Sequence, residues 1–78
     1  MPHLYLHLEN HIGLQRDLEG HNYDTIDAAV AEAGRTAGSV MAEDIASGRT
    51  PVGIRVMIED ADGTRIATLQ SSTNIDRC

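Results

Sequence analysis

The segment His3-Leu4-Tyr5-Leu6-His7-Leu8 decides the fold, because leucine alternates with a polar aromatic ring along it. A period of two places successive side chains on opposite faces of a β-strand. The leucines therefore predict a face that packs on a core. His3, Tyr5 and His7 form a second, chemically different face, and the functional question is what that face contacts.

The next segment predicts a hairpin with this first strand. A turn around Gly13 leads into a second strand over Asp17–Tyr23. The register of this turn keeps the leucines on one face, and a slip by one residue would mix the two faces. The pairs it predicts are His7 with Glu19, Tyr5 with His21 and His3 with Tyr23, with Leu4, Leu6, Leu8 and Leu18 on the core face.

An amphipathic helix is predicted from Thr25 to Ser47, with Asp24 as its N-cap and Gly48 as its stop. A helix of about 23 residues is roughly 35 Å long. A six-residue strand spans only about 20 Å, so we expect the helix to extend beyond the sheet. The apolar stripe has helical spacing and consists of Ile26, Ala29, Val30, Ala33, Ala37, Val40, Met41 and Ile45.

A second hairpin follows, with strands over Gly53–Glu59 and Thr64–Gln70 and a turn at Asp60-Ala61-Asp62-Gly63. The element order β-β-α-β-β predicts an α+β fold, a two-layer sandwich with one long helix on one face of a four-stranded sheet. We expect one domain over residues 1–70 and a polar, frayed tail over 71–78. The predicted pairs are Ile58–Ile66 and Val56–Thr68 on the core face, and Glu59–Arg65 and Met57–Ala67 on the other.

These features resemble a family of short bacterial proteins known only as a domain of unknown function. Members start Met-Pro-x-aromatic, continue with a Phe-His-Leu-like strand and an Asp-x-Glu-Gly step, and then have an alanine-rich helix and an Asp-x-Gly hairpin. The matching residues are Met1-Pro2, His7-Leu8, Asp17-Leu18-Glu19-Gly20, Ala28-Ala29, Ala31-Glu32-Ala33, Met41-Ala42-Glu43 and Asp60-Ala61-Asp62-Gly63. The resemblance implies an order of elements and no activity. A topological likeness to antitoxin domains of the HicB type is fainter.

Composition narrows the classes of function. The chain has 78 residues with no Phe and no Trp, so its core contains few large side chains. Small domains of this kind usually need further stabilisation from a disulfide, a metal or a partner subunit. Its single cysteine, Cys78, cannot form an internal disulfide, which leaves a metal or self-association, and we favour self-association. The net charge of −6 disfavours nucleic acid and anionic membranes and suits a basic protein partner. The unpaired cysteine and the lack of a signal-like start predict a cytoplasmic protein.

Two surfaces are candidates for a homodimer interface. The first is the sheet face opposite the helix, and the second is a helix ridge whose small residues, spaced by four, also fit close packing within the monomer. The predicted interaction face consists of His3, Tyr5, His7, Glu19, His21, Tyr23, Arg55 and Met57. The predicted ridge consists of Gly34, Gly38 and Ala42.

No motif names a reaction, so we expect a non-enzymatic interaction or regulatory protein with no catalytic residues, no cofactor and no metal. His3 and His7 would lie about 13 Å apart along a strand, too far to share one zinc ion. One alternative is a small-ligand or metal-binding protein that uses His7, Glu19 and His21. Another is an antitoxin-like partner of a basic toxin. Histidines gathered on one face would also allow a pH-dependent interface.

Overall fold

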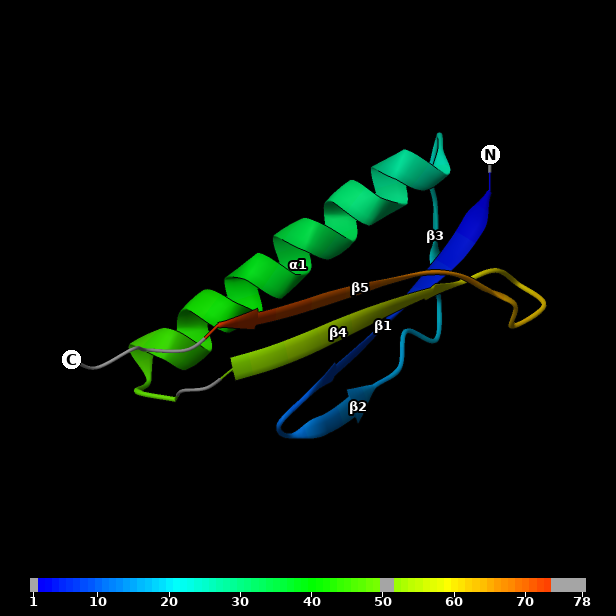
Figure 1. The fold of residues 1–78 in the computed structure, drawn as a ribbon. Coiled ribbons are helices and arrows are strands. Elements are labelled where there is room, and N and C mark those ends of the chain that lie inside the picture. The colour runs from blue at the N-terminus through cyan, green and yellow to red at the C-terminus, as the bar shows by residue number, and fades with distance from the viewer. Residues whose placement is uncertain (1, 50–51, 74–78) are drawn as a thin grey trace.

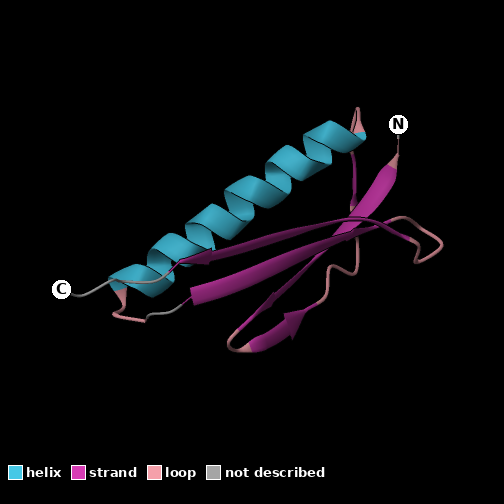
Figure 2. Ribbon diagram, viewed as in Figure 1, coloured by secondary structure: helices cyan, strands magenta, loops and turns pink. Residues whose placement is uncertain are grey.

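One helix lies across one face of a twisted antiparallel sheet in the computed structural model, which describes residues 2–49 and 52–73 (Figure 1). We call the sheet face that the helix covers the helix face and the opposite one the outer face. The predicted α+β architecture is confirmed, with five strands instead of four (Figure 2). The sheet order is β2-β1-β4-β5, and β3 also pairs with β1. The elements are β1 (His3–Asn10), β2 (Gly13–Gln15), β3 (His21–Asn22), α1 (Ile26–Ala46), β4 (Val52–Glu59) and β5 (Arg65–Thr73).

The first hairpin differs from its prediction. Strand β2 pairs Gln15 with Leu8, and β3 pairs His21 with Leu4, so the predicted strand over Asp17–Tyr23 is wrong. Residues 16–20 leave the sheet between these two short strands. Because the register differs by one residue from the predicted one, the faces are exchanged in β3. The predicted pairs His7–Glu19, Tyr5–His21 and His3–Tyr23 are therefore wrong, and Leu18, predicted for the core, is 82% exposed.

The helix keeps its predicted place, but Thr25 instead of Asp24 is the N-cap. Thr25 has extended backbone, and its hydroxyl accepts the Ala28 N–H at 3.0 Å. At the other end Gly48 has a φ of +85°, as the predicted stop requires. The Gly48 N–H donates to the Ile45 carbonyl at 2.9 Å, and the Arg49 N–H donates to the Asp44 carbonyl at 3.0 Å. This pair of hydrogen bonds closes the helix in a Schellman motif.

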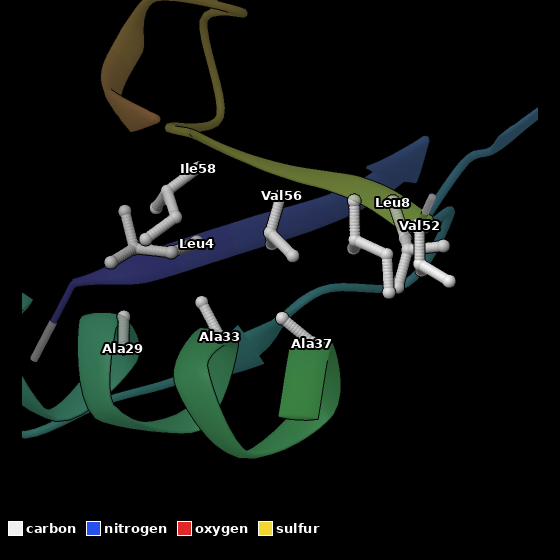
Figure 3. Close-up of a cluster of buried hydrophobic side chains, with 9 residues drawn as sticks. Leu4, Leu8, Ala29, Ala33, Ala37, Val52, Val56 and Ile58 are labelled. Carbon is white, nitrogen blue, oxygen red and sulfur yellow. The ribbon is translucent and has the colours of Figure 1, made fainter. Parts of the chain in front are cut away.

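The core lies between alanines of α1 and aliphatic side chains of β1 and β4 (Figure 3). Ala29, Ala33 and Ala37 are at most 2% exposed, so the helix backbone comes close to the sheet. The two ends of the predicted apolar stripe are not covered, since Ile26 is 45% and Ile45 is 41% exposed. This exposure agrees with a helix longer than the sheet it covers. The buried sheet side chains of this core are Leu4, Leu8, Val52, Ile54, Val56 and Ile58.

The second hairpin contains a β-bulge. Glu59 pairs with Arg65 as predicted, but Ile58 pairs with Ala67, so Ile66 is an extra residue in β5. Beyond the bulge the predicted pairs Ile58–Ile66, Val56–Thr68 and Met57–Ala67 are wrong: Val56 faces Leu69 and Met57 faces Thr68. Ala67 and Leu69 therefore lie on the helix face.

Strand β5 is also longer than predicted. It continues to Thr73, which pairs with Val52, so residues 71–73 belong to the sheet and not to a frayed tail. The remainder of the predicted tail, 74–78, lies outside the described residues.

Candidate functional site

The predicted functional face has a buried histidine at its centre. His7 on β1 is 7% exposed, and both of its ring nitrogens have partners. Nδ1 accepts the backbone N–H of Asp17 at 3.0 Å, so the ring proton must be on Nε2. Nε2 lies 3.3 Å from Oε1 of Glu59 on β4. His7 is thus a neutral ring that joins the loop over residues 16–20 to the middle of the sheet.

Asp17 holds this loop against β1. Its Oδ2 accepts the Leu6 N–H at 3.2 Å, and its Oδ1 accepts the Gly20 N–H at 3.0 Å. Leu6 lies between the residues of β1 that pair with β2 and with β3, so the carboxylate takes the position of a missing strand partner. Partial burial opposes ionisation of Asp17, but the N–H groups of Gly20, Leu6 and Glu19 outweigh it and lower its pKa below 3.8.

Gly20 lets the loop lie directly on two aromatic rings of β1. Its φ is +70°, and a Cβ added there would come within 2.7 Å of His3 Nε2 and 2.8 Å of Tyr5 Cε2. The His3 and Tyr5 rings meet edge-on, with centroids 5.2 Å apart. The loop therefore covers part of the outer face that the sequence predicted to be free.

Gly20→Ala is expected to lower the free energy of unfolding by about 1–3 kcal/mol, because alanine at positive φ is strained and its methyl meets both rings. Urea unfolding measures the change. Gly63→Ala is the matched control: Gly63 has a φ of +82°, but a Cβ added there meets no atom within 4 Å. Equal losses for the two variants would contradict close contact between the loop and the rings.

His3 holds the end of the same loop. Its Nδ1 lies 2.6 Å from Asn22 Oδ1, and its Nε2 lies 2.9 Å from the Glu19 carbonyl. Both neighbours are acceptors, which only the doubly protonated ring satisfies completely. The Asn22 side chain, followed by the Glu19 carbonyl, raises the pKa of His3 above 6.5.

Asn22→Ala is expected to lower the pKa of His3 toward 6.5, because it removes the largest cause of the shift. A group with a raised folded pKa stabilises the fold below its unfolded pKa and loses this contribution as the pH rises through the folded value. The His3 contact should therefore weaken as the pH rises above 6.5 and through the raised pKa of His3. An NMR titration of the His3 ring measures the shift, with Asn10→Ala as the control. An unchanged His3 titration in Asn22→Ala would contradict the contact.

Glu59 extends the polar cluster to the second hairpin. Its Oε2 lies 3.4 Å from Arg65 Nη2, which confirms the predicted pairing of these two residues. Since His7 occupies Oε1, each carboxylate oxygen of Glu59 has one partner. The outer-face cluster thus consists of Asp17, His7, Glu59 and Arg65, linked in that order.

The eight residues predicted to form one interaction face do not share one surface. His7 and Met57 are buried, at 7% exposed each. Glu19 is exposed and contacts His3 through its backbone carbonyl. Arg55 pairs with Glu9 at 3.4 Å, with both side chains close to half exposed. Of the predicted residues in β1 and β4, only His3, Tyr5 and Arg55 remain accessible on the outer face.

His21 and Tyr23 lie on the helix face, next to the start of α1. Their rings meet edge-on with centroids 5.2 Å apart, and Tyr23 packs against the core. Partial burial and the nearby Glu32 carboxylate raise the pKa of Tyr23. Since His7 lies on the outer face, the predicted ligand set of His7, Glu19 and His21 is not brought together. Within residues 2–49 and 52–73, no three His, Cys, Asp or Glu side chains could hold a metal ion.

The predicted ridge of Gly34, Gly38 and Ala42 is exposed on α1. A Cβ added to Gly34 or Gly38 would meet no atom within 4 Å, so close packing inside the monomer does not explain these glycines. The helix is not long and apolar enough to cross a membrane, and it is the one helix of the described chain.

Gly38→Ala is expected to raise the free energy of unfolding by about 1 kcal/mol, because glycine is a poor helix residue and the site has room for a methyl group. Thermal unfolding at a fixed protein concentration measures this gain. Gly48→Ala is the control, since Gly48 has positive φ and its replacement should destabilise the protein. A loss of stability in Gly38→Ala would indicate a contact on the ridge.

A family model described as a domain of unknown function, DUF6894, matches residues 3–72. The chain belongs to this family. The DUF6894 match starts with the first residue of β1 and ends one residue before the end of β5, so it covers all elements of the fold. No curated protein and no solved structure matches the chain.

Two residues of the outer-face cluster were not predicted as partners of His7. The sequence predicted Glu19 as the partner of His7, but in the structure His7 contacts Asp17 and Glu59 instead. The step Asp17-Leu18-Glu19-Gly20 contains the missed signal, since an aspartate three residues before a glycine fits a carboxylate that caps a tight loop. Glu59 gives no such local signal, because its contact with His7 depends on the pairing of β1 with β4.

Proposed function

We propose that this DUF6894 chain is a non-enzymatic, cytoplasmic interaction module that works as a homodimer. The observation that carries the proposal is the free edge of β5. This nine-residue strand pairs with β4 on one side, and no described strand pairs with it on the other. A long unpaired edge offers a row of backbone donors and acceptors to another chain.

The outer-face cluster supports a structural role over catalysis. Asp17 uses both carboxylate oxygens on backbone N–H groups, and His7 uses both ring nitrogens. A general acid or base must be able to reach a proton on a substrate. These groups are committed to hold the loop over residues 16–20 and the two hairpins together, which suits a rigid scaffold.

The scarcity of large side chains in the core supports self-association. Ile58 and Val56 are the largest fully buried side chains among the described residues, and the helix contributes three alanines to the core. Small domains with little buried apolar surface usually gain stability from a metal, a disulfide or a partner subunit. The single cysteine of the chain fits a reducing compartment and excludes an internal disulfide. A partner subunit is then the simplest source of the additional stability.

The solution mass, measured by light scattering after size exclusion, tests the proposal. It is measured at about pH 7.5 and about pH 5.5, because these values lie above and below the ordinary pKa of histidine. The same runs are repeated with a chelator and with added zinc. We expect the mass of a dimer at both pH values, unchanged by chelator. A monomer at all concentrations would contradict the homodimer, and a mass that falls with chelator would favour the metal-binding alternative.

A further inference from the structure

We propose that two copies pair through β5, antiparallel about a two-fold axis at Leu69, so that their sheets become one continuous sheet with both helices on the same face. This inference rests on the proposed homodimer and assigns its interface. Pairing centred on Leu69 overlaps residues 66–72 of β5, from Ile66 opposite the partner's Ser72 to Ser72 opposite the partner's Ile66. The β-bulge at the start of this segment puts Arg65 and Thr73 on different faces and leaves them outside the ladder. The features below make a second copy the occupant of this edge.

The two edges of the sheet differ sharply. The β1 side is closed by β2, by the Asp17 carboxylate on the Leu6 N–H, and by β3. These pieces are short, and a charged side chain lies between them, which is how natural proteins protect an edge. Apart from the β-bulge at Ile66, strand β5 has no such protection along Ile66–Thr73, where no residue is charged and none is proline.

Charge favours an identical strand over a basic partner at this edge. The single charged residue of β5 is Arg65, at its first position. In the antiparallel pair the two Arg65 side chains lie at opposite ends, so they do not repel each other. A basic strand would find no carboxylate on β5, although the chain as a whole has a net charge of −6. The edge thus avoids the self-repulsion that an acidic protein otherwise has.

The helix leaves room above β5. On β4 the helix-face residues Val52, Ile54, Val56 and Ile58 are at most 5% exposed. On β5 the helix-face residues Ala67 and Leu69 remain partly exposed, although both pack against the core. The helix therefore covers β4 fully and β5 only in part. Across the two-fold axis Leu69 would meet the partner's Leu69, and the two helices would cover this pair from both sides.

The flank of α1 on the β5 side is apolar beyond the first turn, where Asp27 lies. The opposite flank faces β2 and β3, since Asp44 contacts His11 and Glu32 lies beside Tyr23. By helical periodicity Val30, Met41 and Ile45 fall on the side of β5. No charged residue separates them, so this flank continues the apolar surface from the core toward the proposed axis.

Spacing decides which helix residues take part. With strands about 4.8 Å apart and α1 above β4, the two helix axes lie about 14 Å apart. Directly packed helices are only 8–10 Å apart. Longer side chains such as Met41 and Ile45 can bridge the wider gap, whereas the small residues Gly34 and Gly38 cannot. The sheet edge, and not the glycine ridge, is then the interface.

A charge exchange on β5 tests the pairing. Thr68 and Gln70 are exposed on the outer face, and in the proposed register each lies opposite the other in the partner strand. In T68E/Q70E, position 68 of each copy lies opposite position 70 of the other, so a glutamate faces a glutamate at both pairs. This repulsion should raise the dimer dissociation constant at least about tenfold. T68K/Q70E is the matched control, because it places opposite charges in the same two positions and should keep the dimer. Light scattering over a dilution series measures both constants.

The outcomes separate this inference from the proposed function. A wild-type monomer overturns both. A wild-type dimer with equal dissociation constants in the two variants overturns the β5 interface and leaves the homodimer in place. Weak dimerisation of both variants overturns the register centred on Leu69. Circular dichroism checks that each variant is folded, and only weakening by T68E/Q70E together with retention by T68K/Q70E supports the inference.

Hydrogen exchange gives an independent readout on the wild-type protein. Amides of Ile66–Ser72 that point away from β4 should exchange fast in dilute protein and become protected as the dimer forms. The amides of β4 should show no such dependence on concentration. Fast exchange along β5 at concentrations where the mass is that of a dimer would overturn the inference.

Discussion

Replacing Asp17 with alanine is expected to lower the free energy of unfolding by about 2–4 kcal/mol, because it leaves the partly buried N–H groups of Leu6 and Gly20 without an acceptor. The loss is large for a small domain, whose total stability is about 5–15 kcal/mol. The loop over residues 16–20 should also detach from β1. Urea unfolding at fixed protein concentration measures the first effect, and amide exchange of Leu6 measures the second.

The effect of Asp17 should depend on pH in a defined direction. The folded pKa of Asp17 is lowered below 3.8, so its carboxylate stabilises the fold above that value and the stabilisation is lost as the pH falls through the folded pKa. The difference between the wild type and Asp17→Ala should therefore shrink below about pH 3.8. Glu19→Ala is the control, since its side chain is exposed and only its backbone groups take part, the carbonyl with His3 and the N–H with Asp17. A difference that stays constant down to strong acid would contradict the role of the carboxylate.

Ile58→Ala is expected to lower the free energy of unfolding by about 2–5 kcal/mol, because Ile58 is 1% exposed and its removal leaves a cavity between sheet and helix. The alanines of α1 cannot move in to fill this space, since their side chains end at Cβ. Thermal unfolding should show the loss as a large decrease in Tm.

Ile66→Ala provides the matched control for this prediction. It removes the same atoms from the same hairpin, but Ile66 lies in the β-bulge and is 38% exposed. We expect a loss of less than about 1 kcal/mol, close to that of an ordinary surface substitution. Similar losses for the two isoleucines would mean that Ile58 is not in the core.

Local signals in the sequence predicted the elements that depend on near neighbours. The helix was placed to within one residue at each end, because the apolar spacing, an N-terminal cap and Gly48 act over a few residues. The turn over 60–63 and the Glu59–Arg65 pair also followed from local chemistry. The DUF6894 resemblance added the order of these elements and no further detail.

Register beyond the turns was not predictable, because it depends on small irregularities. The bulge at Ile66 moves Ala67 and Leu69 to the helix face, and the loop over residues 16–20 moves His21 and Tyr23 there. A strand has a period of two, so each shift by one residue exchanges the two faces. This is why the predicted interaction face separated into buried, helix-side and exposed residues.

The sequence by itself determined the α+β architecture, the helix with its alanine stripe and the second hairpin, since each arises from spacing and turn chemistry along the chain. Only the tertiary structure decided that Asp17 replaces a strand partner of β1, that Glu59 contacts His7, and that one edge of β5 has no strand partner among residues 2–49 and 52–73. The physical reason is that these features depend on which distant segments become neighbours. A backbone N–H without a strand partner needs another acceptor, and a strand edge is free only when no other part of the fold covers it.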